Sequence, residues 1–237
     1  MTKTSTTLNL LLRAAPAARR SRTGGLKHIM FAAGTQFWQE GEALTQVLFP
    51  LRGILSLQMS AGPGKRVEVG LVGAEGVAGI SLFLGEPKAR MTVVALTDGE
   101  AVAMPRQVFQ SCLDSPVFRA AVNRYLRFFI LMLAKLAVCN RAHVLESLCA
   151  GRLLLMQDRT GGDSFLVTQE FLSRLLGVRR ATVSHAASRL QKGGSISYDR
   201  RGRLQILDRK RLEKAACSCY RAIKADFDRL VIAQGGW

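Results

Sequence analysis

Residues 168–190, TQEFLSRLLGVRRATVSHAASRL, predict two short helices joined by a glycine turn. Thr168 suits the N-cap of the first helix, whose leucines supply an apolar face. Gly177 stands where the end of a helix favours a left-handed residue. The second helix then directs Val178, Val183 and Leu190 inward. A helix, a glycine-containing turn and a second helix form the helix-turn-helix pattern.

The outer face of the second helix is polar and basic. Its first turn carries two arginines, at the end of a recognition helix that can reach guanine O6 and N7 or a phosphate. The predicted readers are Arg179, Arg180, Thr182, Ser184, His185 and Arg189. The predicted phosphate contacts are Thr168, Gln169, Arg200, Arg201 and Arg203. A helical hairpin with a solvated basic face would show the same pattern, so this segment alone does not decide between the two.

The residues after this segment favour DNA binding. Lys192–Gly194 ends the second helix, and residues 196–198 and 204–207 predict two strands around Asp199–Gly202. Such a hairpin, with arginines near its tip, forms a wing, and a wing beside a recognition helix commonly contacts phosphates. Asp208 is then a good cap for a further helix.

Charge supports a polyanionic partner. The chain has 237 residues, with 34 Lys and Arg against 17 Asp and Glu, a net charge of +17 and a pI near 10.7. Residues 151–237 hold 17 basic and 8 acidic residues, so they alone carry +9. Nucleic acid and an anionic membrane surface both attract such a charge.

A hydrophobic content of 48% argues for a folded globular protein. The length of the chain allows one large domain or two small domains.

The N-terminal half predicts a compact β structure, either a barrel or a jelly roll. All six prolines and most glycines fall there, with short apolar runs between them. We expect one hairpin from 46–51 and 54–59, and a second from 91–96 and 100–104. A further strand follows the turn at Gly62–Gly64.

A long helix is predicted from Pro116, with Ser115 as its N-cap. Two apolar seams run along it with heptad spacing. The second seam consists of Leu126, Ile130, Leu133 and Ala137. One seam can pack on the β domain and the other on a partner helix, although a helix buried in a single subunit is the alternative. We assign the first seam to a homodimer interface: Phe118, Val122, Tyr125, Phe129, Met132, Leu136, Cys139 and His143.

The five cysteines predict neither a disulfide framework nor a metal site. Their number is odd and their spacing irregular. Cys217 and Cys219 are closer in sequence than the usual zinc pair and have no neighbouring His or second pair. No apolar run reaches the ~18 residues of a transmembrane helix, and no signal-peptide core follows the basic N-terminus. We therefore expect a cytoplasmic protein with no membrane partner.

Taken together, these motifs resemble the Crp-Fnr (catabolite activator and fumarate-nitrate reduction regulator) family of bacterial transcription regulators. The most specific stretches are 166–184, 190–194 and 202–208, while 39–42 and 70–79 resemble the β-roll turn and the glycine-rich start of the phosphate-binding cassette. The resemblance spans roughly residues 33–220. It implies an α+β fold: a cyclic-nucleotide-binding-like β-roll (26–115), a dimerisation helix (116–144) and a winged helix-turn-helix domain (145–237), after a flexible basic tail (1–25). It also implies double-stranded DNA, a second copy and RNA polymerase as partners.

The effector site departs from the family pattern. Members that bind cyclic nucleotides have a Glu after the last cassette glycine and an Arg followed directly by Ser or Thr. Here Ile80 follows Gly79, and Met91 separates Arg90 from Thr92. Isoleucine cannot accept a hydrogen bond, and an unpaired buried sugar hydroxyl costs ~1–3 kcal/mol. Gly79, Ile80, Arg90, Met91 and Thr92 are the candidate effector residues, with the effector unknown.

No cofactor is predicted. The family's iron–sulfur sensors use N-terminal cysteines, but the first cysteine here is Cys112, and the three histidines are a poor source of haem ligands. No P-loop, G-x-S-x-G or H-E-x-x-H motif points to an enzyme. We predict a sequence-specific regulator that binds an inverted repeat as a homodimer and has a ligand other than cAMP, or none. A cyclic-nucleotide-responsive regulator and a non-specific, charge-driven DNA binder are the alternatives.

Overall fold

A computed structural model describes residues 9–16, 25–199 and 202–235 of the chain. Side chains at positions 170, 171, 174 and 175 are not described. The described residues form two compact units. The first lies within 1–57, 71–129 and 227–237, and the second within 58–70 and 130–226. None of the described helices is long and apolar enough to cross a membrane.

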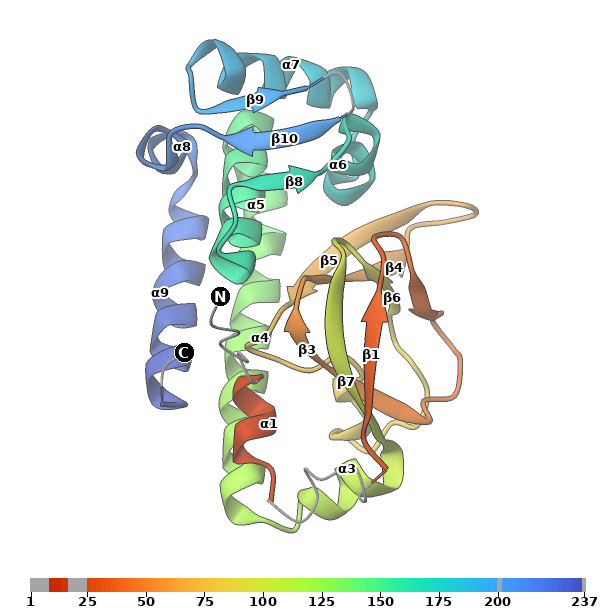
Figure 1. Ribbon diagram of the computed structural model, residues 1–237. Coiled ribbons are helices and arrows are strands. Elements are labelled where there is room, and N and C mark those ends of the chain that lie inside the picture. The colour runs from red at the N-terminus through yellow and green to blue at the C-terminus, as the bar shows by residue number, and fades with distance from the viewer. Residues whose placement is uncertain (1–8, 17–24, 200–201, 236–237) are drawn as a thin grey trace, which may run out of the picture. The chain divides into compact units, whose positions relative to one another are not determined.

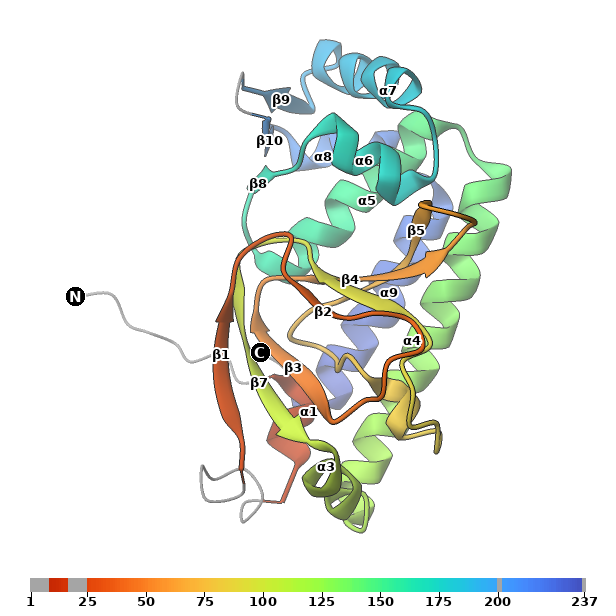
Figure 2. The same ribbon diagram turned by 90° about the vertical axis from the view of Figure 1, so that its right-hand side faces the viewer.

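The first unit contains a β-roll of two antiparallel sheets (Figures 1 and 2). One sheet has the order β1 (Lys27–Phe31), β7 (Gly99–Pro105), β3 (Gln46–Arg52). The other has the order β2 (Gln36–Trp38), β6 (Thr92–Ala95), β4 (Leu55–Ser60), β5 (Arg66–Val72), and the β4–β5 tip belongs to the second unit. A short 3-10 helix, η2 (Ile80–Leu82), follows the glycine-rich segment. Val47, Phe49 and Ile54 are fully buried in the core. The predicted β structure is confirmed.

Both expected hairpins are wrong, although their strands exist. β3 pairs with β7, and β4 pairs with β6 and β5, so the turn at Gly53 carries the chain from one sheet to the other. The turn at Thr97–Gly99 does the same between β6 and β7. The two turns pack together: Ile54 N–H donates to Thr97 Oγ1 at 3.1 Å. At Gly53, where φ is +80°, a Cβ would lie 2.6 Å from the Asp98 carbonyl oxygen. The β4–β5 hairpin around Gly62–Gly64 is present.

The start of the chain is not wholly a flexible tail. Residues Leu10–Ala14 form α1, whose three leucines are buried in the first unit. Asn9 caps this helix by accepting from the N–H groups of Leu11 and Leu12. The predicted tail is therefore wrong for residues 9–16, while positions 1–8 and 17–24 lie outside the described residues.

Helix α4 runs from Pro116 to Ala142, close to the predicted bounds, after α3 (Arg106–Cys112). The seam that we assigned to the dimer interface is instead buried inside the chain. The Phe118 ring contacts Phe109, and Tyr125 lies so close over Gly76 that a Cβ there would be 2.2 Å from its ring. Farther along, Cys139 faces Cys217. All eight residues are buried except His143, which is half-buried.

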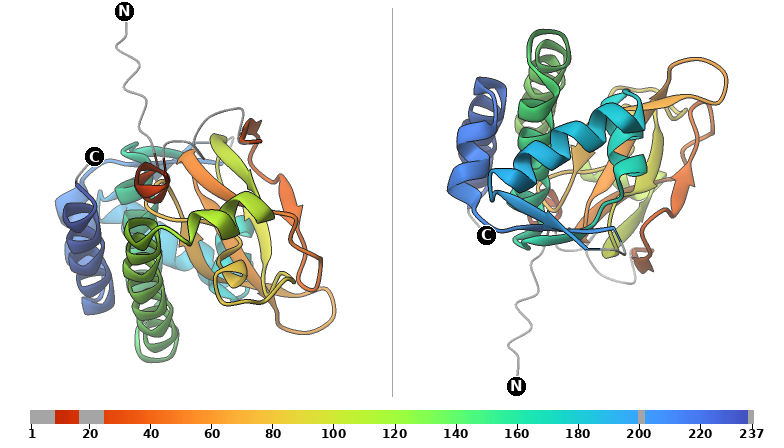
Figure 3. Two further views of the ribbon diagram at one scale, coloured as in Figure 1. Left: turned by 90° about the horizontal axis from the view of Figure 1, so that it is seen from below. Right: turned by 90° about the horizontal axis from the view of Figure 1, so that it is seen from above.

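The second unit contains a three-stranded sheet of order β8-β10-β9, surrounded by helices. Its elements are α5 (Leu145–Thr160), β8 (Ser164–Leu166), α6 (Gln169–Leu176), α7 (Arg180–Lys192), β9 (Ile196–Tyr198), β10 (Arg203–Ile206), α8 (Arg209–Ala215) and the first part of α9 (Ser218–Ala233), whose residues from 227 onward belong to the first unit. Asp208 caps α8 as predicted, accepting from Arg211 N–H. Helices α4 and α9 lie side by side (Figure 3), with Phe128 against Phe227 in the first unit and Cys139 against Cys217 in the second.

Candidate nucleic-acid interface

The helix-turn-helix forms as the sequence predicts. Helix α6 ends at Leu176, and Gly177 takes a φ of +67°, a conformation that costs other residues strain. The turn closes when Val178 N–H donates to the Ser173 carbonyl at 3.0 Å. Arg179 is the extended N-cap residue of α7. The turn therefore fixes the direction in which the first turn of α7 points.

Helix α7 separates a buried face from an exposed basic face. Its inner face consists of Val183, Ala186, Ala187 and Leu190. Five of the six predicted readers are exposed: Arg179, Arg180, Thr182, His185 and Arg189. The first turn of α7 holds no acidic residue. The positive end of the helix dipole and the two arginines therefore reinforce one another toward an anion.

Ser184 and Gln169 are engaged within the protein. Ser184 is half-buried and donates from its hydroxyl to Gln169 Oε1, a contact between α7 and α6. Both were predicted to touch DNA, but in the structure they fix the relative position of the two helices. The exposed Arg189 side chain lies 3.7 Å from Glu146. An exposed ion pair of this kind is weak, so a phosphate can compete for Arg189.

The wing lies next to the start of α6. β9 and β10 pair with each other, with Leu204 of β10 opposite Tyr198 of β9, and the Leu204 side chain is fully buried. Asp199 closes the turn by accepting from Arg203 N–H at 2.9 Å. At Gly202 a Cβ would lie 3.1 Å from Thr168 Cγ2, so Thr168 is brought against the wing. Arg203 is exposed, whereas Arg200 and Arg201 lie outside the described residues.

Four of the five predicted effector residues line one small pocket in the β-roll, and Thr92 is not among its wall residues. Its walls include Trp38, Gly79, Ile80, Arg90 and Met91, and it leaves about 20 Å³ for the centres of water molecules. That is room for roughly one or two waters. A nucleotide would have to displace several of these side chains to enter.

The polar groups at this pocket already have partners. Arg90 is ion-paired with Glu86, and the pKa of Glu86 is lowered by the Lys88 backbone N–H and by Arg90. Thr92, outside the pocket wall, is buried, and its hydroxyl accepts from Glu40 N–H at 3.2 Å. Gly79 has a φ of +91°, which the turn before η2 requires. Ile80 is buried and offers no hydrogen-bond acceptor.

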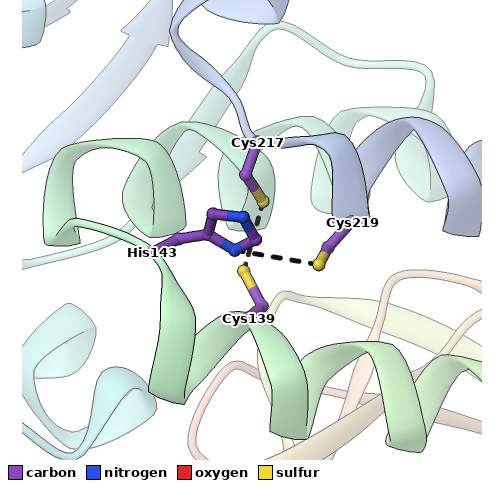
Figure 4. Close-up of side chains that lie close together, drawn as sticks. All are labelled: Cys139, His143, Cys217 and Cys219. Atoms are coloured by element: carbon purple, nitrogen blue, oxygen red, sulfur yellow. Dashed lines mark hydrogen bonds between the residues drawn. The ribbon is translucent and has the colours of Figure 1, made fainter.

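One cluster of metal-ligating side chains was not predicted from the sequence. The ligand atoms of Cys139, His143, Cys217 and Cys219 all lie within 4.8 Å of one another (Figure 4). In the sequence, Cys217 and Cys219 have no adjacent His or second Cys pair, so their spacing alone predicts no metal site. The available signal was the Cys-x-x-x-His spacing at 139–143, which places both side chains on one face of a helix.

A winged helix-turn-helix with a basic outer face defines a DNA-binding domain, here in one chain with a β-roll domain. Residues 149–215 match the Crp-like helix-turn-helix domain, and residues 28–115 match the cyclic nucleotide-binding domain. The chain is therefore a transcription regulator of the Crp/Fnr type, which confirms the resemblance seen in the sequence.

Solved structures show the same fold. A Crp/Fnr-family transcriptional regulator of Eubacterium rectale has a TM-score of 0.67 and 20% identity, over 86% of this chain and 96% of its own. TTHB099, a CRP-family regulator of Thermus thermophilus, has a TM-score of 0.68 and 18% identity, over 79% of this chain and 96% of its own. FixK2 of Bradyrhizobium japonicum has a TM-score of 0.69 and 15% identity, over 81% of this chain and 98% of its own. No curated protein sequence matches this chain.

Proposed function

We propose that this chain is a homodimeric regulator that binds an inverted-repeat operator sequence-specifically in the cytoplasm. The observation that carries the proposal is the exposed outer face of α7, where Arg179 and Arg180 stand at the helix N-terminus. Side chains at this position reach base edges when a recognition helix lies in the major groove. Direct contact with RNA polymerase belongs to the same proposal.

Exposed apolar side chains on one side of α4 support a second copy of the chain as partner. Ile130, Leu131 and Val138 are exposed there, with Ile130 at 56% and Val138 at 53%. Together with Ala134 and Ala137 they form an apolar stripe on one side of the helix. Two chains paired through this stripe would present two recognition helices, and such dimers read half-sites about 10–10.5 base pairs apart.

The β-roll favours a ligand other than cAMP, or none. A purine nucleotide needs far more space than the pocket leaves, and Ile80 cannot bind a ribose hydroxyl. The match of residues 28–115 to the cyclic nucleotide-binding domain favours the alternative, a cyclic-nucleotide-responsive regulator. Arg90 and Gly79 are the residues to test for a ligand.

Selection of duplexes from a random DNA pool tests the proposal. Purified ligand-free protein at ~0.15 M salt, where charge contacts are partly screened, should enrich one inverted repeat. Arg180→Ala should weaken the base preference at one or more positions of the enriched motif, whereas Lys27→Ala on β1 should leave the motif unchanged. Salt-sensitive binding with no enriched motif, both alone and with cyclic nucleotides added, would instead favour a binder driven only by the net charge of +17.

A further inference from the structure

We propose that Cys139, His143, Cys217 and Cys219 form a closed, four-ligand site for Zn²⁺ that joins the end of α4 to the start of α9. The four residues belong to the second unit. Neither the DNA-binding face nor the effector pocket uses them. The inference therefore does not depend on the proposed function.

The distances fit a tetrahedral zinc site. Zn–S bonds of about 2.3 Å and Zn–N bonds of about 2.0 Å place neighbouring sulfurs about 3.8 Å apart and sulfur about 3.5 Å from nitrogen. Cys139 Sγ lies 3.2 Å from Cys217 Sγ, and Cys219 Sγ lies 3.8 Å from His143 Nδ1. All pairs of ligand atoms fall within 4.8 Å. Small side-chain movements would bring the four atoms around one ion.

The scaffold holds the ligands as two pairs. Cys139 and His143 are one helical turn apart at the end of α4, and His143 N–H donates to the Cys139 carbonyl at 3.2 Å. Cys217 and Cys219 flank Ser218, the first residue of α9. The four side chains converge on one point from these two elements (Figure 4).

The donor set is chemically selective. Three thiols and one imidazole favour thiophilic ions such as Zn²⁺ over Mg²⁺ or Ca²⁺, which take oxygen ligands. The three thiols are buried and the imidazole is half-buried. With four protein ligands, no position is open for a water molecule or substrate, as in structural rather than catalytic zinc sites. The 3.2 Å between Cys139 Sγ and Cys217 Sγ is far longer than the ~2.05 Å of a disulfide.

Electrostatics give the ion a physical role. Zinc ligation requires the thiolate form of each cysteine, so the ion would take the place of the thiol protons. Three thiolates around Zn²⁺ carry a net charge of −1. The buried guanidinium of Arg152 lies near the cluster and is also paired with Glu68 at 3.6 Å. Zinc binding would release up to three thiol protons to the solvent.

The site would act as a cross-link in the chain. It connects His143 to Cys219, 76 positions later in the sequence, and Cys139 to Cys217, 78 positions later. Helix α9 follows directly after Cys217, so the ion would hold the first turn of α9 against α4. Removal of the metal should therefore loosen α9 before it affects the β-roll.

The first test uses the full-length wild-type chain, purified under reducing conditions without a metal-binding tag. We expect about one zinc per chain by elemental analysis. After chelation, one equivalent of Co²⁺ should produce the visible spectrum of tetrahedral cobalt with a thiolate charge-transfer band. Zinc should also protect Cys139, Cys217 and Cys219 from alkylation, as read by mass spectrometry, with Cys112 and Cys149 as internal references.

Variants locate the site. Cys219→Ser and His143→Ala should weaken zinc binding by at least the ~10–100-fold seen when outer-shell partners of a metal site are removed. Cys149→Ser, which replaces a buried cysteine outside the cluster, should retain the metal. The proposal would be overturned by reduced wild-type chain that takes up no zinc, by an octahedral cobalt spectrum, or by metal binding that the cluster variants leave unchanged. A disulfide between Cys139 and Cys217 that persists in place of zinc would also overturn it.

Discussion

At the residue scale, we expect the exposed arginines of the second unit to divide into base readers and phosphate contacts. Arg180 is the first residue of α7, and Arg203 lies on the wing strand β10. Arg180→Ala should cost ~1–3 kcal/mol at the base pair it contacts and relax specificity there. Arg203→Ala should weaken binding to all sequences alike. It should also reduce the slope of the logarithm of the binding constant against the logarithm of salt concentration by about one unit. Competition binding at several salt concentrations separates the two effects, and equal behaviour of both variants would contradict the assignment.

Asn9 allows a prediction about stability. Its side-chain amide donates to the carbonyls of Pro50 and Gly76, at 3.0 and 2.7 Å, while its oxygen caps α1. Asn9→Ala would remove the cap and leave two buried carbonyls without this donor. We expect the free energy of unfolding to fall by about 2–4 kcal/mol in a denaturant titration. Asn123→Ala, an exposed asparagine on α4, is the control, and equal loss in both would show that α1 does not contribute as described.

At the element scale, α4 shows what a periodic pattern can and cannot predict. The heptad spacing located the helix to within a few residues, because a period of 3.5 needs only the order of apolar residues. It did not decide which seam meets a partner. Phe118, Tyr125 and Cys139 are covered by Phe109, Gly76 and Cys217 of the same chain, and these contacts are set by tertiary structure. The hairpins failed for the same reason, because alternation identifies a strand but not its neighbour.

The opposite side of α4 yields the next prediction. Ile130→Glu and Val138→Glu would each place a charge in the apolar stripe that we assign to the dimer. A buried unpaired charge is costly, so each variant should shift the chain toward monomer in sedimentation experiments. Leu207→Glu, an equally exposed leucine away from α4, should leave the mass unchanged. Dimers that survive both α4 substitutions would contradict this interface.

At the scale of the whole molecule, the sequence was most informative where a function depends on neighbouring residues. The helix-turn-helix and its wing occupy one short stretch, with Gly177, Arg179 and Arg180 in fixed succession, and the structure confirms the motif. The Cys and His cluster joins two pairs that lie 76 and 78 positions apart, so the local Cys-x-x-x-His spacing at 139–143 could indicate one pair but not its partner. Asn9 was missed for the same reason, because its partners Pro50 and Gly76 are remote in sequence.

The effector question also belongs to the whole molecule, because a ligand that binds only the folded chain must raise its stability. At 100 times its dissociation constant, a ligand adds ~2.7 kcal/mol, or about 5–10 °C in melting temperature for a chain of this size. We expect ~1 mM cAMP to produce no such shift, since Ile80 offers no hydrogen-bond acceptor for the ribose hydroxyl. The selected operator duplex should raise the melting temperature in the same assay and serves as the positive control. A clear shift with cAMP that Arg90→Ala abolishes would show that the pocket opens to admit the nucleotide, and that the cyclic-nucleotide-responsive alternative is correct.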